Sequence, residues 1–319
     1  MFSKPELPYV VGKSLKLRAH EPPAPVKRYF RDNDQRAKEQ QSLDPLDRCL
    51  RHPPLQGRNG QTEAEARIVR PIRAADGHRA QLLAVRIKSS SSHSLPLDRD
   101  LVAKIYDPLY FDDKDDFDPF LSSDAFYTHE AAAYTKLSAL QGDAIPRYFG
   151  SFTIRWPAKQ TARLVRLILV ELIPGRSLYQ LMTTSLPRTL RQNIMKKIID
   201  AESAIYTHNV MHKDVRPINI IIDTVDGKIK RVAIVDFGYC ELERHVDPAF
   251  KALYLPGVPI SPLLRWRRFS MHFDSFIDWN WKPWLQQVYK STEASITEDM
   301  RELWASETAA SYKKCDKPG

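Results

Sequence analysis

Residues 212–219 read HKDVRPIN and residues 236–238 read DFG, and these two polar stretches decide the fold of the chain. Residues 219–235 between them read as a hairpin, with one strand that begins NIII and a returning strand that ends VAIV on either side of an Asp-Gly turn at 226–227. The pattern predicts that the second stretch returns to the start of the hairpin.

That return brings polar side chains together. A hairpin of this length places Asp236 beside Asn219, so that two oxygen ligands converge on one cation. Mg²⁺ prefers such hard oxygen donors and keeps its remaining positions for water and phosphate. The sequence therefore predicts a magnesium site here, with the carboxylate of Asp214 available to orient an attacking hydroxyl.

These stretches resemble the catalytic loop and the magnesium-binding motif of protein kinases. The family pattern His-Arg-Asp-x-x-x-x-Asn occurs with Lys213 in place of arginine, and Asp-Phe-Gly is intact. The frame is also similar to that of aminoglycoside and choline phosphotransferases, and the chain with its Trp-rich end is similar to divergent kinase-like proteins of filamentous fungi. The resemblance covers roughly residues 64–245. It implies an α+β, two-lobed protein-kinase-like fold, with a small antiparallel-sheet N-lobe and a mainly helical, shortened C-lobe.

The resemblance also implies roles for the polar residues, with ATP and Mg²⁺ as the bound groups. Asp214 would accept a hydrogen bond from the acceptor hydroxyl and take its proton. Asn219 and Asp236 would hold Mg²⁺, and Arg216 would contact the transferring phosphoryl group. Alternatively, Asp214 could cap a turn, Asn219 could bond the loop backbone and Asp236 could end a strand. That all three occur together in the family's order favours the functional interpretation. His212 is expected to hold the loop backbone.

A lysine in an apolar strand needs an anion. Residues 101–106 read LVAKIY, and burying Lys104 there is costly unless a carboxylate meets it. Glu130 shares the apolar face of a helix that Ser122-Ser123-Asp124 predicts to begin. We expect Lys104 to pair with Glu130 and, by the resemblance, to reach the ATP phosphates. The alternative is an edge strand with the lysine in solvent.

The inter-lobe connection implied by the resemblance follows a strand at 164–170. Val170 would stand at the back of the nucleotide pocket, and Glu171 and Ile173 would present backbone groups to the adenine. An ordinary strand end before Pro174-Gly175 fits the same local sequence.

The phosphate-covering loop is where the chain departs from the family. Strands expected at 66–72 and 81–87 flank Asp76-Gly77, and the family's Gly-x-Gly-x-x-Gly is absent. A glycine-poor loop limits how closely backbone amides approach phosphates. This departure puts ordinary nucleotide affinity in question.

Prolines and charges fill the N-terminal part. We expect residues 1–62 to be a loosely docked extension with a short polar helix at 31–41, residues 63–173 to be the N-lobe and hinge, and residues 174–319 to be the C-lobe. Tryptophans gather in the last part of the C-lobe, where they either pack a core or stack on bases, and core packing is the preferred interpretation.

Composition narrows the class of protein. The 319 residues carry a formal net charge of +9, but the charges are scattered, which disfavours a nucleic-acid partner. Three widely spaced cysteines argue against a disulfide scaffold, and no apolar run approaches a membrane span. We expect an intracellular protein, cytoplasmic or nuclear, without a membrane span.

The sequence thus favours an ATP- and Mg²⁺-dependent phosphotransferase, a divergent protein kinase acting on Ser/Thr hydroxyls of a protein acceptor. Two alternatives stay open. The absent glycine loop and the absent Ala-Pro-Glu motif favour a small-molecule kinase of the aminoglycoside or choline kind. The same loop motivates a pseudokinase that binds nucleotide or partners without transfer.

Overall fold

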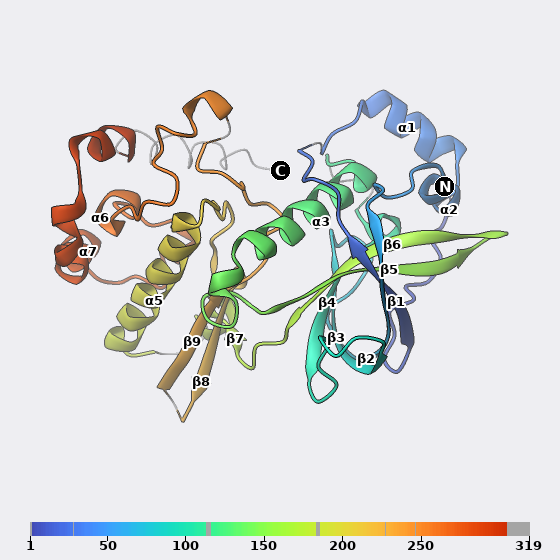
Figure 1. The fold of residues 1–319 in the computed structure, drawn as a ribbon, viewed down its shortest axis with the longest axis horizontal. Coiled ribbons are helices and arrows are strands. Elements are labelled where there is room, and N and C mark those ends of the chain that lie inside the picture. The colour runs from blue at the N-terminus through green and yellow to red at the C-terminus, as the bar shows by residue number, and fades with distance from the viewer. Residues whose placement is uncertain are drawn as a thin grey trace. The chain divides into compact units, whose positions relative to one another are not determined.

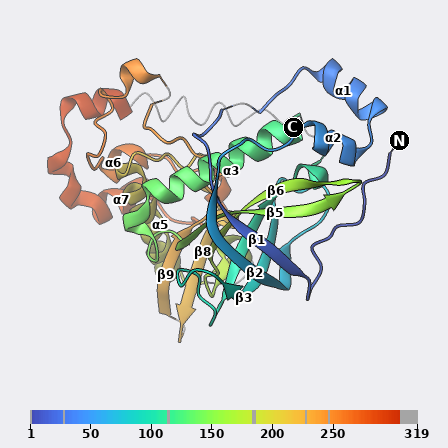
Figure 2. The same cartoon turned by 45° about the vertical axis from the view of Figure 1, so that its right-hand side comes forward.

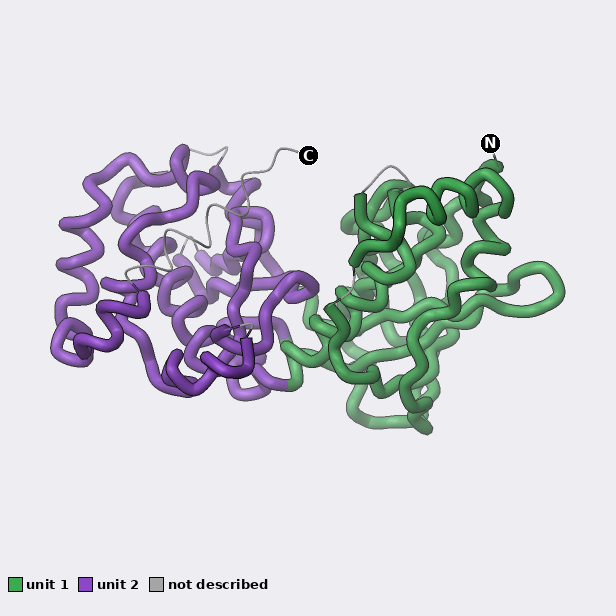
Figure 3. The backbone as a smooth tube through the Cα atoms, turned by 90° about the horizontal axis from the view of Figure 1, so that it is seen from above, with its two compact units in different colours: residues 1–135, 147–172 green, residues 136–146, 173–319 purple. Residues whose placement is uncertain are grey.

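The computed structural model describes residues 2–27, 29–112, 116–182, 186–226, 228–245 and 247–304. Over these ranges the chain is α+β and divides into two compact units (Figure 3). The first contains residues 1–135 and 147–172, and the second contains residues 136–146 and 173–319. None of the helices in the described ranges has the length and apolarity that crossing a bilayer requires.

The described part of the first unit is built on a closed antiparallel barrel in the order β1-β2-β3-β4-β6-β5 (Figures 1 and 2). Leu17 of β1 faces Ile154 of β5, and this pairing closes the barrel. The strands are β1 (Ser14–Glu21), β2 (Arg58–Arg73), β3 (Gln81–Ser90), β4 (Asp100–Tyr106), β5 (Tyr148–Ala158) and β6 (Thr161–Glu171). The helices are α1 (Asn33–Ser42), α2 (Pro45–Arg51) and α3 (Pro119–Lys136).

Strand β1 corrects the expectation of a loosely docked N-terminal extension. Its side chains alternate between the barrel core and the surface, so Leu15 and Leu17 are 1% and 2% exposed while Lys16 faces outward. Because β1 pairs with both β2 and β5, the expected sheet becomes a closed barrel. The predicted short helix in this region is confirmed as α1.

Helix α3 begins earlier than predicted. The side chain of Asp118 accepts hydrogen bonds from the backbone N–H groups of Phe120 and Leu121, both at 3.0 Å. Asp118 is therefore the cap, and Pro119 occupies the first turn, where its missing N–H costs nothing. The prediction from Ser122 placed the start one turn too late.

The second unit is organised around one hairpin and one long helix. Within its described residues a sheet in the order β7-β8-β9 packs against α5, and Ile194 and Ile198 of the helix share a core with Ile220 and Ile222 of the sheet. Its strands are β7 (Arg176–Ser177), β8 (Ile220–Val225) and β9 (Lys228–Ile234). Its helices are α4 (Leu178–Leu181), α5 (Arg188–Thr207), α6 (Pro262–Arg265) and α7 (Trp281–Tyr289).

The hairpin forms where it was predicted. Asp226 turns with a φ of +50°, while Gly227 lies outside the described residues.

The tryptophans of the C-terminal part pack into this unit, as preferred above. Trp266, Trp281 and Trp304 are at most 7% exposed. Each indole N–H has a partner: Trp266 donates to Glu202 at 3.0 Å, Trp281 to the carbonyl of Trp266 at 2.9 Å, and Trp304 to the Tyr206 hydroxyl at 2.9 Å. Rings fixed in this way serve the core rather than a base-stacking surface.

Candidate functional site

The buried lysine of β4 meets a buried carboxylate of α3. The Lys104 Nζ lies 2.5 Å from Glu130 Oε2, and the two side chains are 8% and 2% exposed. In the barrel, Lys104 lies between Leu82 of β3 and Ile168 of β6, so β4 is an interior strand. The predicted ion pair is present, and the edge-strand alternative is wrong because both sides of β4 are paired.

Sequence reasoning missed a third member of this cluster. The Tyr106 hydroxyl donates to the same Glu130 Oε2 at 2.6 Å. Tyr106 follows Lys104 by two residues, and side chains two apart on a strand share a face. That alternation was the available signal, but only the fold shows that a carboxylate lies within reach.

The residues of the predicted catalytic loop are joined by hydrogen bonds and an ion pair within the second unit. Asn219 Nδ2 donates to the Asp214 carbonyl at 3.0 Å and to Asp214 Oδ2 at 2.8 Å. Arg216 Nε lies 2.9 Å from Asp214 Oδ1, and the Asp214 side chain is 30% exposed. The carboxylate is thus held in place by two neighbours of its own loop while it remains accessible to a hydroxyl from solvent.

His212 has structural contacts, as expected. Its Nε2 lies 3.0 Å from the Val235 carbonyl, while the Asp214 N–H donates to its Nδ1 at 3.3 Å. These partners assign the proton to Nε2. Burial lowers the pKa of His212 below its ordinary value. The neutral ring, packed edge-on at 4.9 Å from Phe237, ties the loop to the end of the hairpin.

The register of the hairpin fixes the position of Asp236. Ile220 faces Ile234, and the Val235 N–H donates to the Asn219 carbonyl at 2.9 Å, so the next residue emerges beside Asn219. Asp236 has a φ of +70°, an uncommon conformation for a residue with a side chain. A local strain of this kind persists where the surrounding structure imposes it. Here the fully buried Phe237 anchors the turn.

The predicted hinge residues lie at the end of β6. Val170 is 7% exposed and faces Val102 of β4. The backbone N–H of Glu171 donates to the Arg147 carbonyl at 2.9 Å, and Glu171 faces Leu101 of β4 in the sheet. Ile173 is buried at 8% exposure. Both the hinge and the ordinary strand end remain compatible with these contacts.

The loop between β2 and β3 is tied to its own unit. The Gly77 N–H donates to the Tyr110 carbonyl at 2.9 Å, and the Gln81 side chain accepts from the Ala75 N–H at 2.9 Å. Gly77 has a φ of +88°, which explains the glycine at the tip. Both amides thus already donate to acceptors of the first unit, so they are not poised to receive phosphate.

A buried arginine holds the segment that follows Asp-Phe-Gly. The Arg244 guanidinium, 2% exposed, donates to the carbonyls of Leu255 and Val258, both at 2.6 Å. It also bonds the carbonyl of Tyr206 in α5 at 3.3 Å. This side chain therefore ties residues 255 and 258 to the end of α5, and sequence reasoning did not anticipate it.

The donor set near the hairpin end fits a magnesium ion in its chemistry. Because Asn219 Nδ2 is directed to Asp214, the amide oxygen of Asn219 is the atom left to ligate a cation. With the Asp236 carboxylate it offers hard oxygen ligands of the kind Mg²⁺ takes alongside water and phosphate. Over the described residues, no group of three or more His, Cys, Asp or Glu side chains forms a metal-binding cluster.

The predicted site residues fall into two groups. Lys104, Glu130, Val170 and Glu171 belong to the first unit, and Ile173, Asp214, Arg216, Asn219 and Asp236 to the second. Direct contacts join Lys104 with Glu130, and Asp214 with Arg216 and Asn219.

A match to a known protein family covers the residues of the second group. The model of the protein kinase domain matches residues 136–251, a range that contains Asp214, Asn219 and Asp236. No curated protein matches the chain. Lys104 and Glu130 precede the matched range. Residues 136–251 are therefore similar to the protein kinase domain.

Proposed function

We propose that this chain is an ATP- and Mg²⁺-dependent phosphotransferase with the two-lobed protein-kinase fold, transferring the γ-phosphoryl group of ATP to a Ser/Thr hydroxyl of a protein. Three features support the proposal: the kinase-domain match, the hydrogen-bonded Asp214–Asn219 pair and the buried Lys104–Glu130 pair. The Asp214–Asn219 geometry carries it, because it joins the proposed base to a proposed metal ligand.

In the proposed reaction, the acceptor oxygen forms a bond to the γ-phosphorus, and the bond from that phosphorus to the bridging oxygen of ADP breaks. Asp214 orients the hydroxyl and takes its proton as the new bond forms. Lys104 neutralises phosphate charge, Arg216 contacts the transferring group, and Asn219 and Asp236 hold the cation. Bound Mg²⁺ supplies neutralisation of charge on the phosphate oxygens.

The substitution Asp214→Asn tests the proposal. It keeps the shape and one acceptor oxygen for Asn219 but removes the proton acceptor, so we expect kcat to fall by about 10²–10⁴-fold. The assay is transfer of labelled phosphate from ATP, with Mg²⁺, to a panel of proteins and amino alcohols. Asp278→Asn is the matched control, because Asp278 pairs with Arg191 in the same unit and is outside the proposed site.

The acceptor panel separates the related candidates. Transfer to proteins supports a protein kinase, and transfer to amino alcohols alone supports a small-molecule kinase. Wild-type protein that binds ATP but transfers to neither is a pseudokinase, a second candidate that the engaged amides of Ala75 and Gly77 favour. Transfer that survives in Asp214→Asn contradicts the proposed mechanism.

A further inference from the structure

The Glu130 carboxylate receives a cation and a hydroxyl on one oxygen atom. Lys104 Nζ lies 2.5 Å and the Tyr106 hydroxyl 2.6 Å from Oε2, and all three side chains are buried. Lys104 and Tyr106 project from the same face of β4, so one strand supplies both donors to one residue of α3. The mechanism above uses the lysine and leaves the tyrosine without a role.

A buried carboxylate becomes costly when its partner leaves. In the proposed reaction Lys104 must face phosphate as well as Glu130, and a lysine can do so because its ammonium is a point charge on a flexible stem. In that reaction Lys104 is shared between Glu130 and phosphate. A hydroxyl donor that stays on the carboxylate favours its charged form and keeps it in place.

We propose that Tyr106 is a positioning residue for phosphate binding: it holds the Glu130 carboxylate in the place from which that carboxylate orients Lys104 toward nucleotide. This inference rests on the proposed function. Tyr106 acts through Glu130 and is not assigned a contact with nucleotide.

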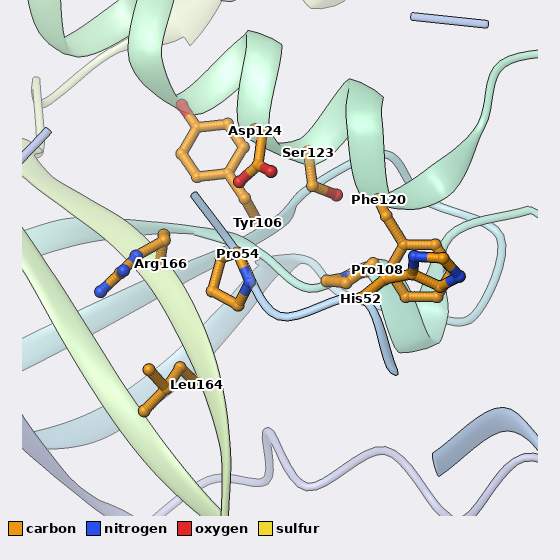
Figure 4. A pocket seen from close by; sticks show the side chains of 9 residues that line it. All are labelled: His52, Pro54, Tyr106, Pro108, Phe120, Ser123, Asp124, Leu164 and Arg166. Atoms are coloured by element: carbon orange, nitrogen blue, oxygen red, sulfur yellow. The ribbon is translucent and has the colours of Figure 1, made fainter. Parts of the chain in front are cut away.

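The surroundings of Tyr106 favour this role over a passive one. Its ring packs edge-on against Tyr127 of α3, with centroids 5.6 Å apart, and the Tyr127 hydroxyl lies 2.6 Å from Nδ1 of His20 in β1. Figure 4 shows the phenol ring extending to α3, where its hydroxyl end meets the helix. The ring is thus fixed between the barrel and α3 while its hydroxyl is directed at Glu130.

The test compares Tyr106→Phe with Tyr9→Phe. Tyr9 is a matched control, because its buried hydroxyl also donates to a carboxylate that pairs with a cation, that of Asp107. Each substitution removes one such bond from the same unit. We expect Tyr106→Phe to raise both the KM for ATP and the Kd for the ATP–Mg²⁺ complex about three- to tenfold, while kcat changes less than about twofold. Tyr9→Phe should leave all three unchanged.

A double-mutant cycle with Glu130→Gln shows whether Tyr106 acts through Glu130. In that background Tyr106→Phe should change the Kd by less than about twofold, because the charge it supports is gone. A full three- to tenfold effect in both backgrounds would mean that Tyr106 acts independently, and the inference would be overturned. Equal KM and Kd values in Tyr106→Phe, Tyr9→Phe and wild-type protein would overturn it as well.

The outcomes for wild-type protein separate this inference from the function it rests on. Protein that binds ATP–Mg²⁺ without transferring phosphate refutes the proposed activity, but the Kd comparison still decides the role of Tyr106. If the wild type neither binds nor transfers, the proposed function and this inference are both refuted.

Discussion

Asp107 and Glu130 are buried carboxylates of the same unit, and each meets a cation and a tyrosine hydroxyl, yet the cations differ. Arg163 grips Asp107 with both arms of its guanidinium, at 2.6 Å and 2.9 Å, and the Tyr9 hydroxyl lies 2.5 Å from Asp107 Oδ2. Burial and then the Asp107 charge raise the pKa of Tyr9 well above its ordinary value, so the hydroxyl remains a donor. Both carboxylate oxygens are engaged in a fixed geometry.

At Glu130 the cation is a lysine, and both Lys104 and Tyr106 meet the same oxygen. An arginine fork fits a carboxylate in a planar, two-bond arrangement, whereas an ammonium can turn toward another anion. We therefore expect the two ion pairs of this unit to have different roles. The Asp107–Arg163 pair is a structural ion pair, whereas Lys104 would, in the proposed function, contact a phosphate as well as Glu130.

The largest expected effect is on stability, from Arg163→Met. The substitution leaves the carboxylate of Asp107 buried without its cation, which should lower the free energy of unfolding by about 3–5 kcal/mol. Chemical denaturation measures the loss, and kcat per folded molecule should not change. A loss below about 1 kcal/mol would contradict the structural role of this pair.

Lys104→Met should lower activity strongly and stability less. We expect kcat/KM for ATP to fall about 100-fold, or about 2.7 kcal/mol, because a charge opposite the phosphates is removed. The loss of stability should be smaller than for Arg163→Met, because Arg163 bonds both oxygens of Asp107 with its planar fork, an arrangement that the ammonium of Lys104 cannot make. Steady-state kinetics and denaturation on the same samples check both parts. Equal losses of kcat/KM and of unfolding free energy in the two variants would contradict the distinction between the two ion pairs.

The two pairs also differ in how far sequence could predict them. Lys104 stands out because one charge interrupts LVAKIY, and the helical spacing places Glu130 on an apolar face. The hairpin between Asn219 and Asp236 was predictable for a similar reason, since its strands and turn are local. Arg163 and Asp107 carry no such signal, because both lie near strand ends where charges are common and only the barrel joins them.

Closure of the barrel was not predicted because the sequence around β1 carries two conflicting signals. Residues 14–21 read SLKLRAHE, an alternating pattern typical of a strand, but the prolines around it favoured an extension. The start of α3 was similarly marked by Asp118-Pro119, a cap followed by a first-turn proline. Whether such a segment forms a strand or a loose extension depends on contacts with residues distant in sequence. Local sequence patterns do not predict those contacts.

The smallest expected effect comes from a carboxylate that has no salt-bridge partner among the described residues. Asp124 of α3 accepts the Leu55 N–H at 3.1 Å and lines a small cavity with Arg166 (Figure 4). Burial raises the pKa of Asp124 from 3.8 to about 6, so the folded state holds a proton that the unfolded state has lost between these values. The wild type should therefore lose stability as pH rises from about 4 through 6.

Asp124→Asn removes this titration while keeping a neutral side chain of the same shape. Its free energy of unfolding should match that of the wild type near pH 4 and exceed it by about 1–2 kcal/mol at pH 8, a figure reduced because the carboxyl is partly exposed. His20, whose pKa burial and then Arg166 lower to about 4, destabilises the fold on acidification, but it is present in both proteins and cancels in the difference. Denaturation curves across this range provide the measurement. A difference that does not change with pH would contradict the raised pKa of Asp124.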